Sequence, residues 1–391
     1  MLAACYIRRK AVIPSVYLAG IFRKAVPMSR ITSSLVKTIF LSLCIVCASA
    51  WLLSCVSSKN DASEGIAFVS GMGYGWNLGN TFDAWPNAGG RRAGLETETS
   101  WGNPRTTRKL IKYIREQGFD TIRIPVTWGP HMGDAPEYTI DPAWMSRVEE
   151  VVDWALAEKM YVIINLHHEK SWLEKASKDY EGAMTQFRAA WRQIAARFRE
   201  RTDHLIFESM NEIDFTDLPI EENGVLVNRV NAEFVMLVRA SGGGNRKRWL
   251  LLPGIGADLD KACDYLKLPD DPRCIVSVHY YLPPQFAIAT PGTSWGYQYS
   301  WGTDEDRKTM DANFAKLKEL YLDRGIPVII GEYGCLMRNK DRASRADYFR
   351  SIVRHSRANG ICPVFWDNGE ELDRRAYVWR QEGILPALTG N

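Results

Sequence analysis

Two glutamates, Glu212 and Glu332, stand where short apolar runs end. Asn211-Glu212 follows the run Leu205–Met210, and Glu332 follows Pro327–Gly331. Two carboxyl groups that face one substrate can divide the work of catalysis, since one can transfer a proton while the other acts as nucleophile or base. The two positions therefore predict acid/base chemistry, provided that the fold brings them together.

Other polar and aromatic side chains occupy the same kind of position. Arg123 lies inside Ile-Arg-Ile-Pro-Val, and a run ending at Leu166 is followed by two histidines and a glutamate. The candidates that join the two glutamates are Arg123, His167, Asn211, His279, Tyr281 and Trp366, with His168, Asn77 and Asn80 as further candidates. Together they predict a polar cleft.

Eight short apolar runs are predicted as strands because most are continuously apolar over four to six residues, which is typical of parallel strands covered on both faces. These are Gly73–Leu78, Thr121–Val126, Tyr161–Leu166, Leu205–Met210, Trp249–Leu252, Ile275–His279, Pro327–Gly331 and Cys362–Trp366.

Amphipathic stretches between the runs predict helices. They are Asn103–Gln117, a helix beginning at Asp141-Pro142, Tyr180–Arg199, Asn223–Ala240, Asp258–Leu266, Asp304–Asp323, Ser344–Ala358 and a short last helix, Glu382–Leu388. Strand–helix alternation favours parallel βα units, and eight units close into a single (β/α)₈ TIM barrel over residues 66–391. A doubly wound sheet is disfavoured because the glycines of the first run lack Gly-x-Gly-x-x-Gly spacing.

A barrel gathers the carboxyl ends of its strands at one rim, so Glu212 and Glu332 would face each other across its mouth. Paired carboxylates are the minimal set for hydrolysing a glycosidic bond. A separation near 5 Å between the two carboxyl groups would indicate retention of the anomeric configuration, and one of roughly 6.5–9.5 Å would indicate inversion. The sequence does not give this separation. Arg123 and Tyr281 are candidates to stabilise an ionised nucleophile, and Asn211 could bind the sugar 2-hydroxyl.

Seven ordered motifs resemble glycoside hydrolase family 5 of clan A, most closely its subfamily 4. They span residues 71–370 and comprise 75–83, 119–128, 165–169, 207–212, 278–281, 330–334 and 365–369. The resemblance implies a retaining mechanism without a metal or other cofactor. It also implies endo-acting hydrolysis of β-1,4-glucan, mixed-linkage glucan, xyloglucan and sometimes xylan.

The resemblance also implies roles for individual residues. Glu212 matches the acid/base and Glu332 the nucleophile of the family. Arg123 and Tyr281 match the pair that stabilises the nucleophile, while His167 and His279 match the two active-site histidines. Trp366 matches the aromatic floor under the −1 sugar, and Asn211 matches the residue before the acid/base.

Structural alternatives exist for several candidates. His167, His168, Glu169 and His279 could ligate a metal, but the first strand offers Asn77 and Asn80 rather than His-x-His. Direct sugar contact by Asn77, Asn80 or Asp83 stays open. Tryptophans in expected rim loops, some of which could line further subsites, are Trp85, Trp101, Trp128, Trp172, Trp295 and Trp301; Trp144, Trp154 and Trp191 have helical spacing and are expected in the core.

The first 54 residues predict a targeting segment. From Met28, a better start than Met1, a short basic stretch precedes an apolar run of about 16 residues, shorter than the roughly 20 that span a bilayer. Leu-Leu-Ser-Cys resembles a bacterial lipobox, so Cys55 is expected to carry lipid and residues 55–65 to form a tether. The alternatives are an ordinary membrane anchor or a plain signal. The predicted location is the cell envelope, facing the periplasm or the medium.

Charge and cysteine content limit the partners. Residues 1–54 hold seven of the 49 basic residues and none of the 46 acidic ones, so the remainder is slightly acidic and gives no support for nucleic-acid binding. Cys263, Cys274, Cys335 and Cys362 lack Cys-x-x-Cys spacing, so a structural zinc site is not expected; Cys263 and Cys274 flank a loop and could pair. A monomer is the default expectation.

The leading hypothesis is a lipid-anchored, retaining endo-β-1,4-glucanase that acts on cellulose and mixed-linkage glucan. Xyloglucanase, mannanase or xylanase activity is the alternative within the same class. Two other classes are a non-catalytic glycan-binding lipoprotein and a metal-dependent hydrolase.

Overall fold

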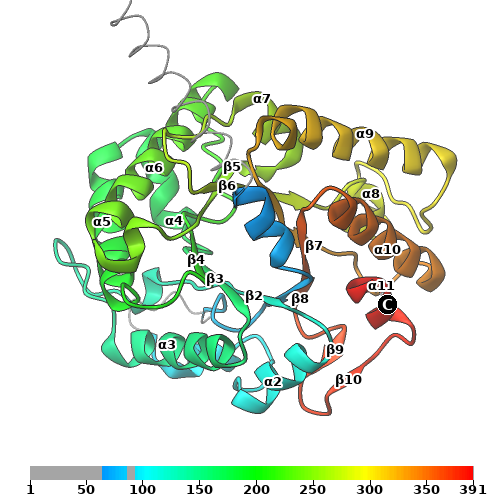
Figure 1. Cartoon of the computed structure of the whole chain (residues 1–391), viewed down its shortest axis with the longest axis horizontal. Coiled ribbons are helices and arrows are strands. Elements are labelled where there is room, and N and C mark those ends of the chain that lie inside the picture. Colours follow the sequence, from blue (N-terminus) through cyan, green and yellow to red (C-terminus); the bar gives the residue numbers. More distant parts are fainter. Residues whose placement is uncertain (1–63, 86–92, 391) are drawn as a thin grey trace, which may run out of the picture. The chain divides into compact units, whose positions relative to one another are not determined.

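Eight parallel strands form a closed barrel, in the order of the sequence (Figure 1). The computed structural model describes residues 64–85 and 93–390. The strands are β1 (Gly75–Leu78), β2 (Thr121–Ile124), β3 (Tyr161–Asn165), β4 (Leu205–Glu208), β5 (Leu250–Asp258), β6 (Cys274–Tyr280), β7 (Val328–Tyr333) and β8 (Cys362–Asp367). The predicted TIM barrel is confirmed.

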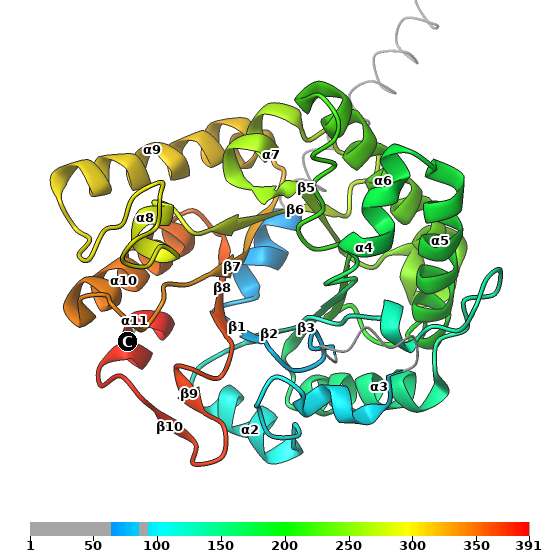
Figure 2. The same ribbon diagram turned by 180° about the vertical axis from the view of Figure 1, so that it is seen from behind.

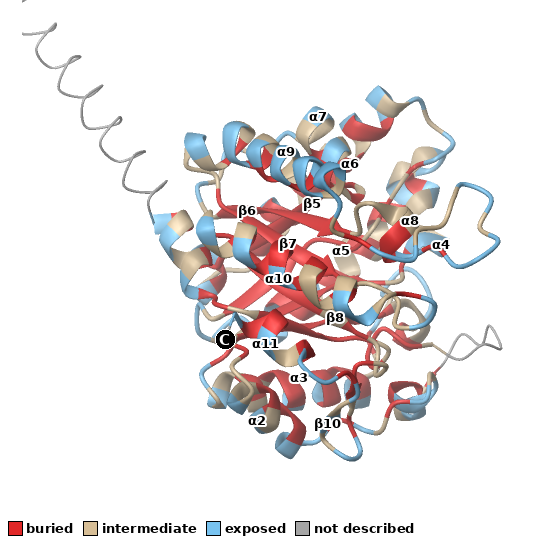
Figure 3. Cartoon of the chain, turned by 90° about the vertical axis from the view of Figure 1, so that its right-hand side faces the viewer, coloured by how far each residue is buried: buried red, intermediate tan, exposed pale blue. Residues whose placement is uncertain are grey.

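Helices surround the strands in both views of the ribbon (Figures 1 and 2). The α-helices are α2 (Arg108–Glu116), α3 (Pro142–Ala157), α4 (Lys170–Leu173), α5 (Tyr180–Arg197), α6 (Ile220–Ala240), α7 (Leu259–Tyr265), α8 (Pro284–Ala287), α9 (Asp304–Leu320), α10 (Arg342–Ala358) and α11 (Ile384–Thr389). A two-stranded sheet of β9 (Leu372–Asp373) and β10 (Val378–Trp379) follows β8. Burial follows this arrangement, with buried strands and helices exposed on their outer faces (Figure 3).

The apolar core has two parts. A large cluster packs between the strands and the helices, and a smaller one includes alternate strand residues such as Ile163, Ile206 and Leu251. Residues 64–71 form a helix before β1, and Val69 and Met72 join the smaller cluster. The prediction that a tether extends to residue 65 is therefore wrong at its end, because residues 64 and 65 are helical.

Local chemistry explains where the elements begin and end. Strand β2 stops at Ile124 because Pro125 has no N–H to donate to a neighbouring strand. Helix α2 begins at Arg108 rather than Asn103, since the Thr107 side chain caps it by accepting from the Leu110 N–H. Asn103 instead donates to backbone carbonyls of residues 79, 80 and 368, so it ties together the loops after β1 and β8.

The other differences are small. Helix α6 begins three residues before the prediction, directly after Pro219, and α11 begins at Ile384 after Gly383, whose φ is +74°.

The described residues include no helix long and apolar enough to cross a membrane. The predicted signal, Met28 and Cys55 lie outside the described residues. Cys263 and Cys274 are both free thiols.

Candidate active site

Glu212 and Glu332 converge at the carboxyl ends of β4 and β7. One carboxylate oxygen from each and one ring nitrogen of His279 lie within 4.8 Å of one another. His279 Nδ1 is 2.8 Å from Glu212 Oε1 and 3.6 Å from Glu332 Oε2, so the imidazole bridges the two carboxylates. Their spacing suits a retaining glycosidase, in which the carboxyl groups are about 5 Å apart, and is too short for the water of an inverting one.

Arg123 organises the floor of this site. Its side chain is fully buried and donates to Glu332 Oε1 at 2.7 Å, to Asn211 Oδ1 at 2.8 Å and to Asn77 Oδ1 at 2.9 Å. Its Nε donates to Glu208 Oε2 at 2.8 Å. A planar guanidinium with every edge engaged has one orientation, so Arg123 fixes Glu332 and Asn211 relative to each other.

Glu208 is a site residue that the sequence reasoning missed. It lies inside β4 with its side chain buried, and it accepts from Arg123, from Asn165 Nδ2 at 3.0 Å and from Ser277 Oγ at 2.8 Å. A charge inside the predicted strand Leu205–Met210 was the available signal, because a buried carboxylate needs a partner. Glu208 and Glu332 accept from different nitrogens of Arg123, so both carboxylates balance its charge.

Tyr281, His167 and Trp366 complete the predicted set. The Tyr281 hydroxyl donates to Glu332 Oε2 at 3.0 Å, which gives each oxygen of Glu332 one donor. The rings of His167 and Trp366 are parallel within 7°, with centroids 5.7 Å apart. Trp366 is half-buried at the end of β8, and a Cβ on Gly79 would lie 2.9 Å from its ring, so glycine is needed for this close packing.

Burial and charge shift the protonation of the three central groups. Burial alone would raise the pKa of Glu212, but the hydrogen bond and charge of His279 outweigh it, so its pKa lies below the ordinary value. Burial dominates at Glu332 and raises its pKa, although His279 and Arg123 oppose the rise. Burial would lower the pKa of His279, but Glu332 and Glu212 outweigh it and the pKa is raised.

These directions describe a coupled group rather than independent acids. Because the pKa of His279 is raised and that of Glu212 is lowered, the electrostatics favour the proton of their hydrogen bond on the histidine. Moving it along the 2.8 Å hydrogen bond gives a neutral imidazole and a protonated Glu212, which is the form that a general acid requires. Exclusion of water favours this neutral pair, since burying an ion pair costs solvation energy.

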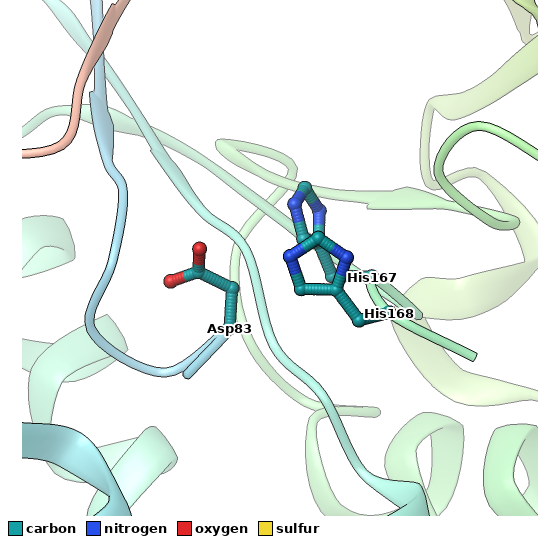
Figure 4. A group of neighbouring side chains, drawn as sticks. All are labelled: Asp83, His167 and His168. Carbon is teal, nitrogen blue, oxygen red and sulfur yellow. The ribbon is translucent and has the colours of Figure 1, made fainter. Parts of the chain in front are cut away.

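A second group of potential ligands lies beside the cleft. Asp83, from the loop after β1, faces the imidazoles of His167 and His168, which follow β3 (Figure 4). Asn165 Nδ2 lies 3.2 Å from His167 Nδ1; an amide nitrogen only donates, so the His167 proton is on Nε2. The Asp83 oxygens accept backbone N–H groups of Thr81 at 2.7 Å and Asn80 at 3.0 Å.

The donor chemistry of this group therefore does not fit a metal site. His167 presents an N–H where a metal would need a lone pair, and the Asp83 carboxylate is engaged by the backbone. Burial also raises the pKa of Asp83 to about 6 and lowers that of His168 to about 4. The group suits hydrogen bonding to hydroxyl groups instead.

The structure separates the remaining candidates. Asn77 is fully buried and its Nδ2 donates to backbone carbonyls, so it positions Arg123 and does not reach the cleft. Asn80 has a φ of +53° in a tight turn, and its carbonyl accepts from Asn103. His168 packs against Trp85, with ring centroids 4.6 Å apart.

The tryptophans divide almost as predicted. Trp144 and Trp191 are buried in the core, while Trp154 is only partly buried against it. Trp128 and Trp301, expected in rim loops, are buried, and the Trp128 indole donates to the Asn165 carbonyl. Of the tryptophans expected in rim loops, Trp85, Trp101, Trp172 and Trp295 keep exposed surface.

A closed parallel barrel whose rim brings together a buried carboxylate, a partly exposed carboxylate, an arginine and a tyrosine defines an enzyme of the glycoside hydrolase class. The chain belongs to the cellulase family, glycosyl hydrolase family 5, because the sequence model of that family matches residues 87–372. The resemblance seen in the motifs is thereby confirmed.

Individual relatives agree with the family. The chain is 39% identical over 341 residues to "Cellulase/esterase CelE" of Acetivibrio thermocellus; the match covers 83% of the chain and 40% of that protein. Among solved structures it resembles a lichenase of the family from Caldicellulosiruptor sp. F32 in complex with cellotetraose, with 35% identity and a TM-score of 0.78; coverage is 83% of this chain and 94% of that one.

A broad-specificity endoglucanase of subfamily 4 from Clostridium acetobutylicum gives the same picture. It is 35% identical with a TM-score of 0.75, over 83% of this chain and 99% of that one. The barrel of this chain is therefore equivalent to nearly the whole of the two solved relatives.

Proposed function

We propose that this chain is a retaining, endo-acting β-1,4-glucanase that hydrolyses cellulose and mixed-linkage glucan. The observation that carries the proposal is the convergence of Glu212 and Glu332 oxygens with His279 within 4.8 Å. The similarity to a lichenase bound to cellotetraose and to a broad-specificity endoglucanase supports glucan as the substrate.

The proposed reaction has two displacements. Glu332 attacks the anomeric carbon of the sugar over Trp366, while Glu212 gives its proton to the departing oxygen. The glycosyl–Glu332 ester leaves no charge on that carboxylate, so Glu212 can then act as base toward water. Arg123 and Tyr281 hold Glu332 in line, and the Nε2–H of His167 is available to a sugar hydroxyl.

Two matched variants test the assignment of roles. Glu212→Ala should lose most activity on mixed-linkage glucan but keep activity on an aryl cellobioside with a good leaving group, which needs no protonation. Glu332→Ala should lose both activities. Full activity of Glu212→Ala on both substrates would show that Glu212 is not the acid.

Other specificities within the family predict different products. A panel of cellulose, mixed-linkage glucan, xyloglucan, xylan and mannan, analysed for released oligosaccharides, separates them. A non-catalytic glycan-binding protein would release no reducing sugar from any of the five.

We further propose that the enzyme is held at a bacterial cell envelope by lipid on Cys55. Support comes only from the sequence Leu-Leu-Ser-Cys after the apolar run. Labelling with a fatty-acid analogue in the host should disappear in Cys55→Ala, and labelling that persists would contradict the anchor.

A further inference from the structure

A large side pocket opens next to the catalytic centre. Its volume is about 840 Å³, within the range of roughly 300–1,000 Å³ that small-molecule sites have. The wall is built from loops after β1, β2 and β3 and from the start of α5, and includes Trp85, Tyr138, Lys170 and Trp172. None of the residues that hold Glu332 lines it, so it is distinct from the catalytic floor.

A row of ring contacts, two edge-to-face and the last one stacked, connects the pocket to Trp366. Trp85 packs on His168 at 4.6 Å, His168 on His167 at 4.3 Å, and His167 on Trp366 at 5.7 Å between centroids. The charge of Lys170, which lines the pocket, also helps to lower the pKa of Glu212. The pocket and the catalytic centre are therefore neighbours, joined by the rings of His167 and His168.

Glu169 fixes one wall. Its carboxylate is 1% exposed and accepts the backbone N–H groups of Trp128 and Gly129 and the indole N–H of Trp172. A Cβ on Gly129 would lie 2.7 Å from the Glu169 carboxylate and 3.1 Å from Trp172 Nε1. The buried Glu169 carboxylate thus fixes the orientation of the half-buried Trp172 ring. A tryptophan that only covers the surface would not require a buried hydrogen-bond acceptor.

We infer that this pocket binds a neutral pyranose unit of the polysaccharide, with Trp172 as its platform and Glu169 as the residue that positions the platform. Aromatic faces suit the C–H faces of pyranoses, and indole and phenol rings also offer polar edges. The inference rests on the proposed glucanase function. The pyranose could come from the main chain of the glucan or from a sugar branch on it.

Calorimetry on the full chain carrying Glu332→Ala, which prevents hydrolysis, tests the pocket. The probes are cellotetraose and a xylosylated cello-oligosaccharide of the same main-chain length. A loss of affinity of about tenfold for both probes on adding Trp172→Ala supports a main-chain sugar, and a loss for the branched probe alone supports a branch. Changes below twofold for both probes, or no binding of either probe before the substitution, would overturn the inference.

Two further variants guard against a trivial loss of folding. Trp172→Phe keeps an aromatic face but loses the indole N–H. Glu169→Gln keeps an oxygen that accepts from the backbone but can place its amide group against the indole N–H. Both variants should lower the affinity for the same probe less than Trp172→Ala does. Gly129→Ala should weaken it too, whereas Gly133→Ala, whose Cβ would lie 3.5 Å or more from its neighbours, should not. Equal effects of the two glycine variants would contradict a built wall.

The outcome is separable from that of the proposed function. Hydrolysis of mixed-linkage glucan by the unsubstituted protein decides the function. An active enzyme whose pocket variants bind both probes normally refutes only the pocket.

Discussion

Glu208→Gln probes the buried carboxylate that shares Arg123 with Glu332. The substitution keeps the shape of the side chain and removes its charge. Its remaining oxygen can still accept from Arg123 and Asn165, while the Ser277 hydroxyl can turn to accept from the new amide. The fold should therefore survive, and the loss should reflect charge alone.

The size of the effect follows from the three donors. A hydrogen bond to a charged group contributes about 1.5–3 kcal/mol and a neutral one about 0.5–1.5 kcal/mol, so the bonds from Asn165 and Ser277, which become neutral, lose roughly 2 kcal/mol together. The bond from Arg123 keeps one charged partner and loses only its ion pairing. Relief of the cost of burying the carboxylate offsets part of this loss. We expect the free energy of unfolding to fall by about 1–3 kcal/mol, measured by urea denaturation.

The pH dependence of activity gives the second readout. With Glu208 neutral, the Arg123 charge acts on Glu332 alone and favours its ionised form, so the pKa of Glu332 should fall. The acidic limb of kcat/KM should then move to lower pH. Glu98→Gln is the matched control, because Glu98 is also buried and accepts from Arg147 and from the Thr106 N–H, away from the cleft.

The two glutamine variants should therefore lose comparable stability, and only Glu208→Gln should move the acidic limb. An acidic limb that stays in place or moves to higher pH in Glu208→Gln would refute the proposed sharing of Arg123.

Three further predictions concern the same centre. Tyr281→Phe removes the donor to Glu332 Oε2 and should lower kcat/KM about 10- to 100-fold, with little change in Tm; unchanged kinetics would exclude the contact from catalysis. The folded-state pKa of His279 is raised, so its stabilising effect should be complete below about pH 6.5 and should disappear as the pH rises through the folded-state pKa. The free energies of unfolding of wild type and His279→Gln, measured by urea denaturation, should therefore differ most at low pH. A difference that grows with pH would contradict the ion pairing. EDTA should leave glucan hydrolysis unchanged, since the Asp83, His167 and His168 donors do not fit a metal; activity lost to EDTA and restored by a divalent ion would show otherwise.

The fold was predictable because its signals are local. Continuous apolar runs and amphipathic stretches alternate along the chain, and most of the predicted strands carry at their ends a polar or aromatic residue that the barrel gathers at one rim. Boundaries were less predictable where one side chain decides them, as when Thr107 caps α2 and Asn103 bonds to distant loops.

The site residues were predictable when their type is unusual for their position. Glu212 and Glu332 follow apolar runs, whereas Glu208 lies four residues before Glu212, inside β4, and only the three-dimensional structure reveals its partners Arg123 and Ser277. Asn77 lies at the end of a predicted strand, as a site residue should, but its side chain donates to a backbone carbonyl and accepts from Arg123 and so is not available to a substrate. Contacts between distant strands decide such roles, and no local pattern encodes them.

Trapping the glycosyl–enzyme intermediate tests the central claim most directly. A 2-deoxy-2-fluoro cellobioside with a good leaving group should inactivate the enzyme, and mass spectrometry of its peptides should place one added disaccharide on Glu332. A label on any other residue would contradict the claim that Glu332 attacks the sugar while Glu212 supplies the proton. Rapid turnover of a good-leaving-group substrate without any covalent adduct would contradict it equally.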